Sequence, residues 1–405
     1  MERAVIQSDQ DYVIPAMGQK YVMTVSNRSP YWWGTAALAA AVTYPFTPLL
    51  VFWTAHMARS YFQLFLFSGA SLVMLLYPAC GLFLLLRTAK RADRSSLIRR
   101  GLGILLIISP VLRVFSSVVA GLLNIPASSL AVWFDLWIIL AALMLWRIAN
   151  PKRIFSVRTM SKTRTVHGLG AILIALFVVA HMTVNLSILK SPEAYLSAAS
   201  ALRLAYRTPI AEPILIAVLV LQIATGLMMA ADTLVHRVSS ENLIQIACGL
   251  YLVVFIASHT IAVAVLGRVQ LNPGPDFTYA STGPRGLLAN LGGVPLAPYY
   301  LLAVVTFFTH LSRPVRVWTV RIGKTRLALP GAYAVVSIGF VVAVALLIAL
   351  CTPMITRHLA HRFPNSAQLM RSLPPPIHLG ENGTAGVKQL YPWCEATSRC
   401  WYYPR

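Results

Sequence analysis

Apolar runs of bilayer-spanning length constrain this fold more than any other feature of the sequence. A helix needs about 20 predominantly apolar residues to cross the roughly 30 Å hydrocarbon core of a bilayer. Such runs recur at about 35–56, 61–87, 101–123, 128–147, 168–189, 210–232, 245–267, 296–313 and 331–351. The sequence therefore predicts an all-α integral membrane protein with about nine transmembrane helices.

The composition supports a membrane protein. Hydrophobic residues make up 57% of the chain and charged residues 11%, whereas about a quarter of a soluble domain is charged. The mean hydropathy is +0.68. The Ala-, Leu- and Val-rich composition and the missing presequence favour a bacterial inner membrane, with a mitochondrial membrane as the alternative.

The formal net charge of +22 comes from basic residues that gather in alternate loops, at 87–100, 150–164 and 313–326. By the positive-inside rule, these loops and the N-terminal segment 1–29 face inward, and the polar tail 352–405 lies outside. Basic runs of this kind anchor a polytopic protein to its membrane. We therefore expect membrane lipids as partners and no nucleic acid.

Self-comparison indicates an internal repeat. Residues 94–126 resemble residues 239–273, and a weaker match sets the first apolar run against the run that contains His181. We predict two tandem four-helix units, 30–150 and 165–325, followed by the helix 331–351; chance resemblance between apolar helices is the alternative. In this register Leu97 pairs with Leu243, Gly103 with Gly249, and Arg113 with His259.

Two histidines in the second unit lie at matching depth. His181 is about 13 residues into its span and His259 about 14 into its own, and both spans run outward, so their rings reach similar heights. One histidine from each of two facing helices is the ligand set of a bis-histidine b-type haem. A structural zinc site would need four ligands. The alternative is that both histidines hydrogen-bond Ser258, Thr183 or backbone carbonyls.

The stretches 181–227, 257–268 and 298–318 resemble a known family. They are similar to the cytochrome b membrane-anchor superfamily of succinate dehydrogenase and fumarate reductase, above all to its stand-alone branch, which includes fungal mitochondrial membrane proteins with similar His-Thr-x-Asn, Tyr-Arg-x-Pro and Glu-Pro motifs. The resemblance covers about residues 165–320. It implies a haem b protein of electron transport, with iron as the bound metal.

The resemblance also suggests ligand roles. In two-haem members, the first and third helices of the bundle hold one haem, and the second and fourth hold the other. His181 and His259 would then bind a haem in the outer half of the membrane. His310 would be one ligand of a second haem, but Gln222 stands where its partner histidine is expected. His310 would bind a five-coordinate haem, line a quinone pocket or hydrogen-bond Gln222; we favour the last.

Several polar residues fit around these histidines. Arg203, Tyr206, Arg207 and Arg268 lie on the outer side, where arginines would pair with haem propionates; interfacial anchoring is the alternative. We assign no site role to the remaining histidines: His56 and His167 at helix ends, His236 on the surface, and His358, His361 and His378 in the tail.

The first unit carries no haem ligands in this interpretation. Arg113 and Asp135 lie at similar depths, and a lone charge in hydrocarbon is very unfavourable, so we predict that they form a buried pair. Cys394 and Cys400 lie in the outer tail and are candidates for a disulfide. Cys80, Cys248 and Cys351 are expected to fill apolar space.

Three function classes remain open. The first is a haem b protein that transfers electrons in the membrane, with quinone or a redox partner subunit. The second is a haem-free membrane scaffold or lipid-handling protein, and the third is a secondary transporter. The sequence offers no nucleotide fingerprint, iron–sulfur spacing or nucleophile constellation. An electron-transfer subunit is therefore favoured over a stand-alone enzyme.

Overall fold

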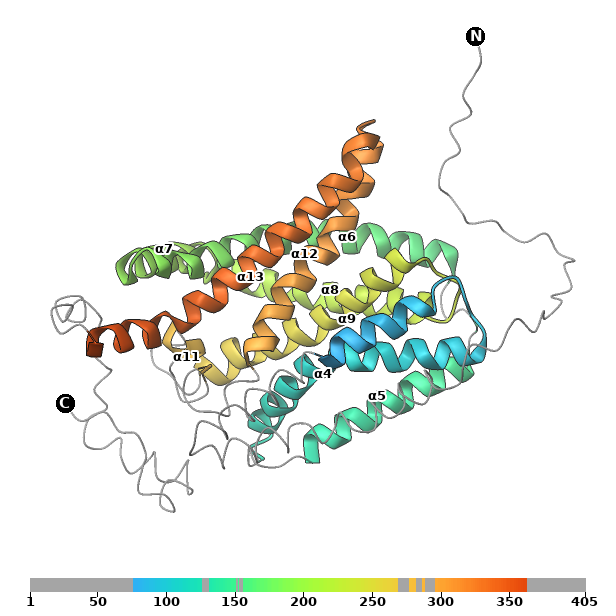
Figure 1. Ribbon diagram of the computed structural model, residues 1–405, viewed down its shortest axis with the longest axis horizontal. Helices are drawn as coiled ribbons and strands as arrows, with labels where there is room; N and C mark the ends of the chain where they lie inside the picture. The colour runs from blue at the N-terminus through green and yellow to red at the C-terminus, as the bar shows by residue number, and fades with distance from the viewer. Residues whose placement is uncertain are drawn as a thin grey trace, which may run out of the picture.

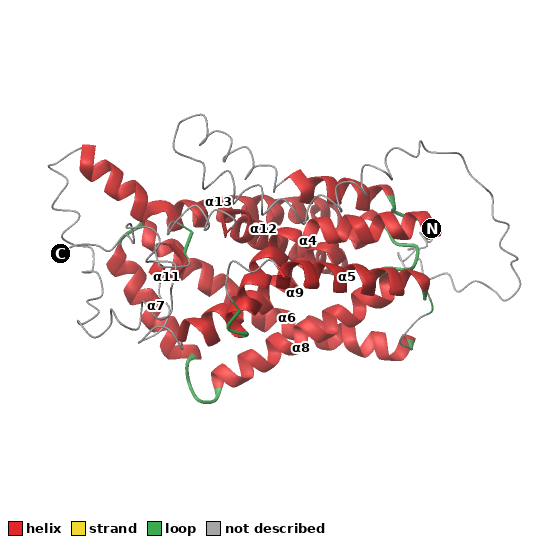
Figure 2. Cartoon of the chain, turned by 90° about the horizontal axis from the view of Figure 1, so that it is seen from below, coloured by secondary structure: helices red, strands yellow, loops and turns green. Residues whose placement is uncertain are grey.

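The computed structural model describes residues 76–125, 131–150, 152, 156–268, 277–281, 286–287 and 296–362. Within these ranges the chain is helical and contains no strand, as Figures 1 and 2 show. The all-α prediction is therefore confirmed for the described part. The expected tail disulfide Cys394–Cys400, the residues His56 and His378, and the first apolar run lie outside it.

Seven long helices form the body of the part that the structure describes. They are α4 (Arg94–Leu122), α5 (Ala131–Ala149), α6 (Val157–Leu186), α8 (Ala211–Thr233), α9 (Ser240–Thr260), α12 (Leu296–Arg321) and α13 (Thr325–Arg362). The shorter helices are Leu76–Arg87, α7 (Pro192–Tyr206) and α11 (Phe277–Ser281). A 3-10 turn, η2 (Ser187–Leu189), extends α6, and a π-helical segment, η3 (Ile261–Gly267), extends α9.

Six helical segments of the described part are long and apolar enough to cross a membrane. They are Arg94–Leu122, Ala131–Ala149, Arg158–Leu189, Ala211–Thr233, Ser240–Gly267 and Thr325–Thr352. The expected count of nine is not confirmed. The run 35–56 and most of 61–87 lie outside the described residues, and α12, which carries polar residues such as Thr306 and His310 along its length, is not among the six.

Helix ends differ from the predicted spans where polar residues continue a helix. α6 begins at Val157, because the Ser156 hydroxyl caps it by accepting from the Thr159 backbone N–H at 3.1 Å; a side-chain oxygen satisfies such an orphan N–H. At the other end of the chain, α13 continues to Arg362. The first part of the expected tail is therefore helical.

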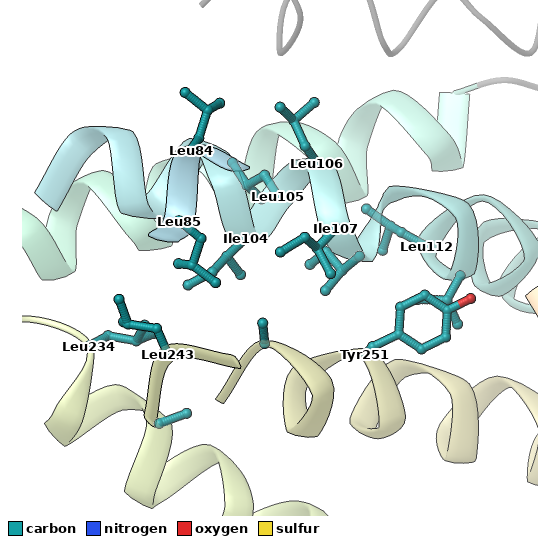
Figure 3. Packing of buried hydrophobic residues seen from close by; sticks show 14 of the residues in the cluster. Leu84, Leu85, Ile104, Leu105, Leu106, Ile107, Leu112, Leu234, Leu243 and Tyr251 are labelled. Carbon is teal, nitrogen blue, oxygen red and sulfur yellow. The ribbon is translucent and has the colours of Figure 1, made fainter. Parts of the chain in front are cut away.

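The core lies between the helix Leu76–Arg87, α4, α5 and α9, with contributions from the end of α8 and the start of α12. Leu85, Leu106, Leu243 and Tyr251 in this core are fully buried, and in Figure 3 Leu85, Ile104 and Ile107 point toward α9. Lipid tails are as apolar as leucine, so close packing, rather than transfer from water, stabilises this contact. The predicted repeat aligns α4 with α9; the duplication itself stays a prediction.

Two buried arginines tie the α8–α9 corner to the preceding helices. The Arg100 guanidinium, 1% exposed, donates to the carbonyls of Leu234 and His236, the latter at 2.8 Å. Arg147 Nε donates to the Ala231 carbonyl at 2.8 Å. Each guanidinium satisfies carbonyl groups that the end of α8 leaves unpaired.

α12 and α13 form a tightly packed antiparallel pair beside α9 (Figure 1). A Cβ atom at Gly339 of α13 would lie only 2.3 Å from the Phe308 Cβ of α12. Only glycine allows this approach. α6 and α8 pack on each other on the opposite side of α9, so that α9 and α12 face α6 and α8 across the interior.

Candidate functional site

A large cavity separates the two helix pairs. Its volume is about 2480 Å³, and its walls come from α6 and α8 on one side and α9 and α12 on the other. This exceeds the 300–1,000 Å³ of most small-molecule pockets. Among the described residues, α6 packs on α7, α8 and α13 but not closely on α9 or α12. The helices therefore leave room for a bulky occupant.

Five histidines line the cavity, and four of them, His167, His181, His259 and His310, meet as two pairs. The rings of His181 on α6 and His259 on α9 lie with their centroids 6.1 Å apart and their planes at 69°. Two metal–nitrogen bonds of about 2 Å plus about 1 Å from each nitrogen to its ring centre give a span of about 6 Å. The two rings therefore have the separation that one iron between them requires.

The local backbone positions the first pair. α6 carries His181 one and a half turns before its end, and η3 begins two residues after His259. π-helical turns inside α-helices are frequent at functional sites, because the extra residue redirects the side chains around it. The accessible surface of His181 opens into the cavity.

The hydroxyl groups expected to hold these histidines are engaged elsewhere. Ser258 Oγ donates to the Phe255 carbonyl at 3.0 Å and pairs with the Tyr299 hydroxyl at 2.9 Å. Thr183 Oγ1 donates to the Val179 carbonyl at 2.9 Å. The polar neighbour of His181 is instead Asn185, with its Nδ2 3.4 Å from His181 Nε2.

The second pair joins His167 of α6 and His310 of α12. Their ring centroids lie 6.4 Å apart with the planes at 74°. The assignment of His167 to a helix end was wrong, because α6 begins ten residues earlier at Val157 and carries His167 into the cavity wall. The sequence pattern gave this residue no site role, although its spacing of fourteen residues from His181 places both on one face of a helix.

Gln222 has a different partner from the expected one. Its Nε2 lies 3.0 Å from Nε2 of His167, because α8 packs directly on α6. His310 is instead bonded by Gln245 of α9. The backbone carbonyl oxygen of Gln245 lies 3.0 Å from His310 Nδ1, and its side-chain Nε2 lies 3.3 Å from His310 Nε2. The expected Gln222–His310 contact is therefore not formed. Gln222 contacts His167, and Gln245 contacts His310.

The outer arginines divide into two groups. Arg268 lines the cavity and forms an ion pair with Glu212 at the start of α8. Tyr206 also lines it, and the Arg207 guanidinium lies over the Tyr206 ring, 5.9 Å from its centroid. Arg203 and Arg207 are not among the described residues that line the cavity. Their role toward a propionate stays a prediction.

Two further expectations concern residues outside the cavity centre. The Arg113 guanidinium donates to the hydroxyls of Ser116 and Ser117 on its own helix, at 3.2 and 2.8 Å; its pairing with Asp135 stays a prediction. His236, expected at the surface, is half-buried and lines the cavity, with its Nδ1 2.6 Å from the Asp232 carbonyl oxygen.

The donor set suits one class of metal centre. Across the part of the chain that the structure describes, no group of three or more His, Cys, Asp or Glu side chains could hold a bare metal ion. A haem iron needs only two protein ligands, because the porphyrin supplies the other four nitrogens.

Comparison of the chain with protein families, curated proteins and solved structures found no match.

Proposed function

We propose that this protein binds haem b between His181 and His259 and carries electrons within the membrane. The observation that supports the proposal is the 6.1 Å separation of the two rings across a cavity in which α6 does not pack closely on α9 or α12. The resemblance to the cytochrome b membrane-anchor superfamily belongs to the same proposal. Under it, a quinone or a partner subunit supplies and removes the electrons.

The haem, when bound, supplies one-electron redox chemistry. The chain's own residues supply the ligands and their surroundings. The cavity is lined mainly by apolar side chains of α6, α8, α9 and α12, which keep water from the metal and favour the state of lower charge. At the outer mouth, Arg268 offers a guanidinium for a carboxylate, with Glu212 as its present partner.

The orientation follows from the distribution of basic residues. Under the proposal, the end of the cavity near His167 and His310 faces inward, because basic side chains gather there. Cavity-lining residues of this group are Lys90, Arg164, Arg237, Arg313 and Arg316. The His181–His259 pair then lies in the outer half of the membrane.

A haem-free, lipid-handling scaffold is the alternative, and one observation favours it: an apolar cavity of about 2480 Å³ would also accept acyl chains. Paired histidines are not needed for that function. The two functions therefore predict different effects of the same substitutions.

The test is the optical spectrum of purified protein produced in cells supplied with haem. We expect a sharp α band on dithionite reduction. Each of the variants His181→Ala and His259→Ala should lose the absorbance of the haem that these two histidines bind. His236→Ala is the matched control, because this half-buried histidine also lines the cavity, contacts the Asp232 carbonyl and belongs to neither histidine pair. Unchanged spectra in both ligand variants would contradict the proposal, and lipid retained without haem would favour the scaffold.

A further inference from the structure

The end of the cavity nearest His167 and His310 combines basic side chains with apolar walls. Four basic residues that line it are called the basic mouth here: Lys90, Arg164, Arg237 and Arg313. We infer that this end binds a phospholipid with an anionic headgroup, whose phosphate lies at the basic mouth and whose acyl chains lie along the apolar walls. The inference does not depend on haem, because His181 lies about 21 Å further along α6 than His167.

Two arginines of the basic mouth stand on opposite walls of the cavity. Arg164 lies three residues before His167 on α6, and Arg313 lies three residues after His310 on α12. Residues three apart share a helix face, so each arginine is on the same side of its helix as the histidine. The two histidine rings are 6.4 Å apart between centroids. Because α6 begins and α12 ends at this end of the cavity, both arginines lie at one level.

The other two residues of the basic mouth come from loops that are bonded to each other. Lys90 follows the helix Leu76–Arg87, and its backbone N–H donates to the Val238 carbonyl at 2.7 Å. Arg237 precedes Val238 in the loop between α8 and α9. The side chains of Lys90 and Arg237 are both exposed. The basic mouth therefore draws its charge from four separate segments that the fold brings together.

Positive charge exceeds negative charge at this end of the cavity. Among the described residues, the basic mouth and Arg316 line it against only two acidic residues, Asp232 and Glu241. Glu241 forms an ion pair with Arg316. Asp232 is buried and interacts electrostatically with Arg147, which does not line the cavity. A phosphate diester balances part of this excess, and guanidinium groups hold phosphate oxygens with paired hydrogen bonds.

Apolar side chains continue the cavity beyond the basic mouth. Ala171 of α6, Met229 of α8, Ile246 of α9 and Phe307 of α12 all line it. A soluble anion leaves this apolar surface uncovered, whereas acyl chains cover it. Within the described ranges, α6 does not pack closely on α12, which leaves a lateral path from the bilayer for the chains. The lining therefore favours a lipid over a soluble phosphate.

The membrane itself supplies such a ligand on the side where the basic mouth lies. Under the orientation proposed above, the basic mouth faces inward, and anionic lipids are held in the inner leaflet by basic pockets between transmembrane helices. Arg164 belongs to the α6–α8 wall and Arg313 to the α9–α12 wall. A headgroup held by both arginines joins the two walls, and a ligand that binds only the folded state stabilises it.

The test measures phosphatidylglycerol binding to the delipidated full chain in detergent, with phosphatidylcholine of the same acyl chains as the neutral lipid. We expect phosphatidylglycerol to bind more tightly and to raise the thermal midpoint. The double variant Arg164→Gln/Arg313→Gln should bind it about 30-fold more weakly, which is about fivefold for each charge. Arg158→Gln/Arg321→Gln is the matched control and should keep the affinity, because it removes two exposed arginines of the same helices that do not line the cavity.

A second pair of variants tests the acyl chains without changing any charge. Ala171→Phe narrows the cavity beside the basic mouth and should weaken phosphatidylglycerol binding. Ala224→Phe is its control and should keep the affinity, because Ala224 is exposed on α8 and does not line the cavity. Glycerol phosphate and inorganic phosphate carry the charge without the chains, so neither should raise the thermal midpoint.

Three results would overturn the inference. Equal losses in the two double arginine variants would mean attraction to surface charge in general. Equal affinity for the two lipids would mean that the headgroup charge is not recognised. Inorganic phosphate that binds as tightly as phosphatidylglycerol would mean a site for soluble anions.

The haem proposal and this inference can fail separately. The variant His181→Ala/His259→Ala should keep its affinity for phosphatidylglycerol. Lipid bound at the basic mouth of a protein that never holds haem would support this inference and contradict the proposed function. Haem bound by a protein that does not distinguish the two lipids would do the reverse.

Discussion

Phe177 and Phe255 occupy equivalent positions on the two walls of the cavity: each stacks on the histidine four residues further along its own helix. The Phe177 and His181 ring centroids are 6.0 Å apart at 16°, and those of Phe255 and His259 are 5.3 Å apart at 10°. Residues four apart lie one above the other on a helix. The stacked rings therefore hold both imidazoles in place before any ligand arrives.

Replacing Phe255 with leucine should weaken haem binding at the outer site. The imidazole of His259 would lose the ring that fixes its orientation, and loss of such supporting contacts costs about 10- to 100-fold in metal affinity. Haem titration of apoprotein measures the change. Phe340→Leu is the control, since Phe340 is 57% exposed on α13; equal affinities in both variants would contradict the orienting role.

The Arg268–Glu212 pair should tune the redox potential of the outer haem. Glu212→Gln leaves the positive charge of Arg268 unopposed at the cavity mouth, which favours the reduced state and raises the potential. Arg268→Gln should lower it. An effect on the order of 1 kcal/mol, or tens of millivolts, is expected for one partly screened charge. Potentiometric titration gives both values, and shifts of the same sign would count against this role.

Arg100→Met should destabilise the fold markedly. The substitution leaves the carbonyls of Leu234, His236 and Arg91 without their donor in a buried corner, and each unsatisfied carbonyl costs about 1–3 kcal/mol. We expect a loss of at least about 3 kcal/mol in the free energy of unfolding. Thermal unfolding in detergent measures it, with the exposed Arg94→Met as control. Equal stability of the two variants would show that this corner is not buried.

The start of α4 should be sensitive to acid. Although burial alone would raise the pKa of Asp93, hydrogen bonds from Ser95 and Ser96 lower it from 3.8 to about 2. Because the folded pKa is the lower one, the stabilisation is complete above about pH 4 and is lost as the pH falls through about 2. Asp93→Asn should keep the cap and flatten this dependence, whereas Asp93→Ala should cost about 1 kcal/mol at neutral pH.

Thermal midpoints measured between neutral pH and pH 2 test this prediction. The difference between wild type and Asp93→Asn should change as the pH falls through the acidic range. If the difference in thermal midpoint between the two proteins stays constant with pH, the Asp93 carboxylate does not stabilise the folded state through its lowered pKa.

The pairing of His181 with His259 could be predicted from the sequence because both lie at the same depth in apolar runs of the same direction. The position of His167 in the cavity wall beside His310 could not be predicted, because hydropathy marks where apolar residues begin, not where a helix begins. The polar stretch before His167 is helical, with its first turn capped by Ser156. Depth counted from the apolar boundary therefore placed His167 at the helix end.

Which helices pack side by side was the other feature that the sequence could not predict. Depth alone allowed Gln222 to meet His310, but α8 packs on α6, so Gln222 meets His167 instead. Arg203 and Arg207 were expected beside the same haem as Arg268, yet Arg268, and neither of these two, is among the described residues that line the cavity. Which helix faces which is decided by close contacts such as that of Gly339 with Phe308, and no hydropathy pattern records these.

The reduced-minus-oxidised spectrum of the purified wild-type protein tests the central claim most directly. The protein should be produced in cells supplied with haem precursor and measured without added ligand, before and after dithionite. Haem b held by two imidazoles predicts a sharp α band that appears on reduction and co-elutes with the monodisperse protein. Monodisperse protein with no such band would contradict the claim that the paired histidines bind haem.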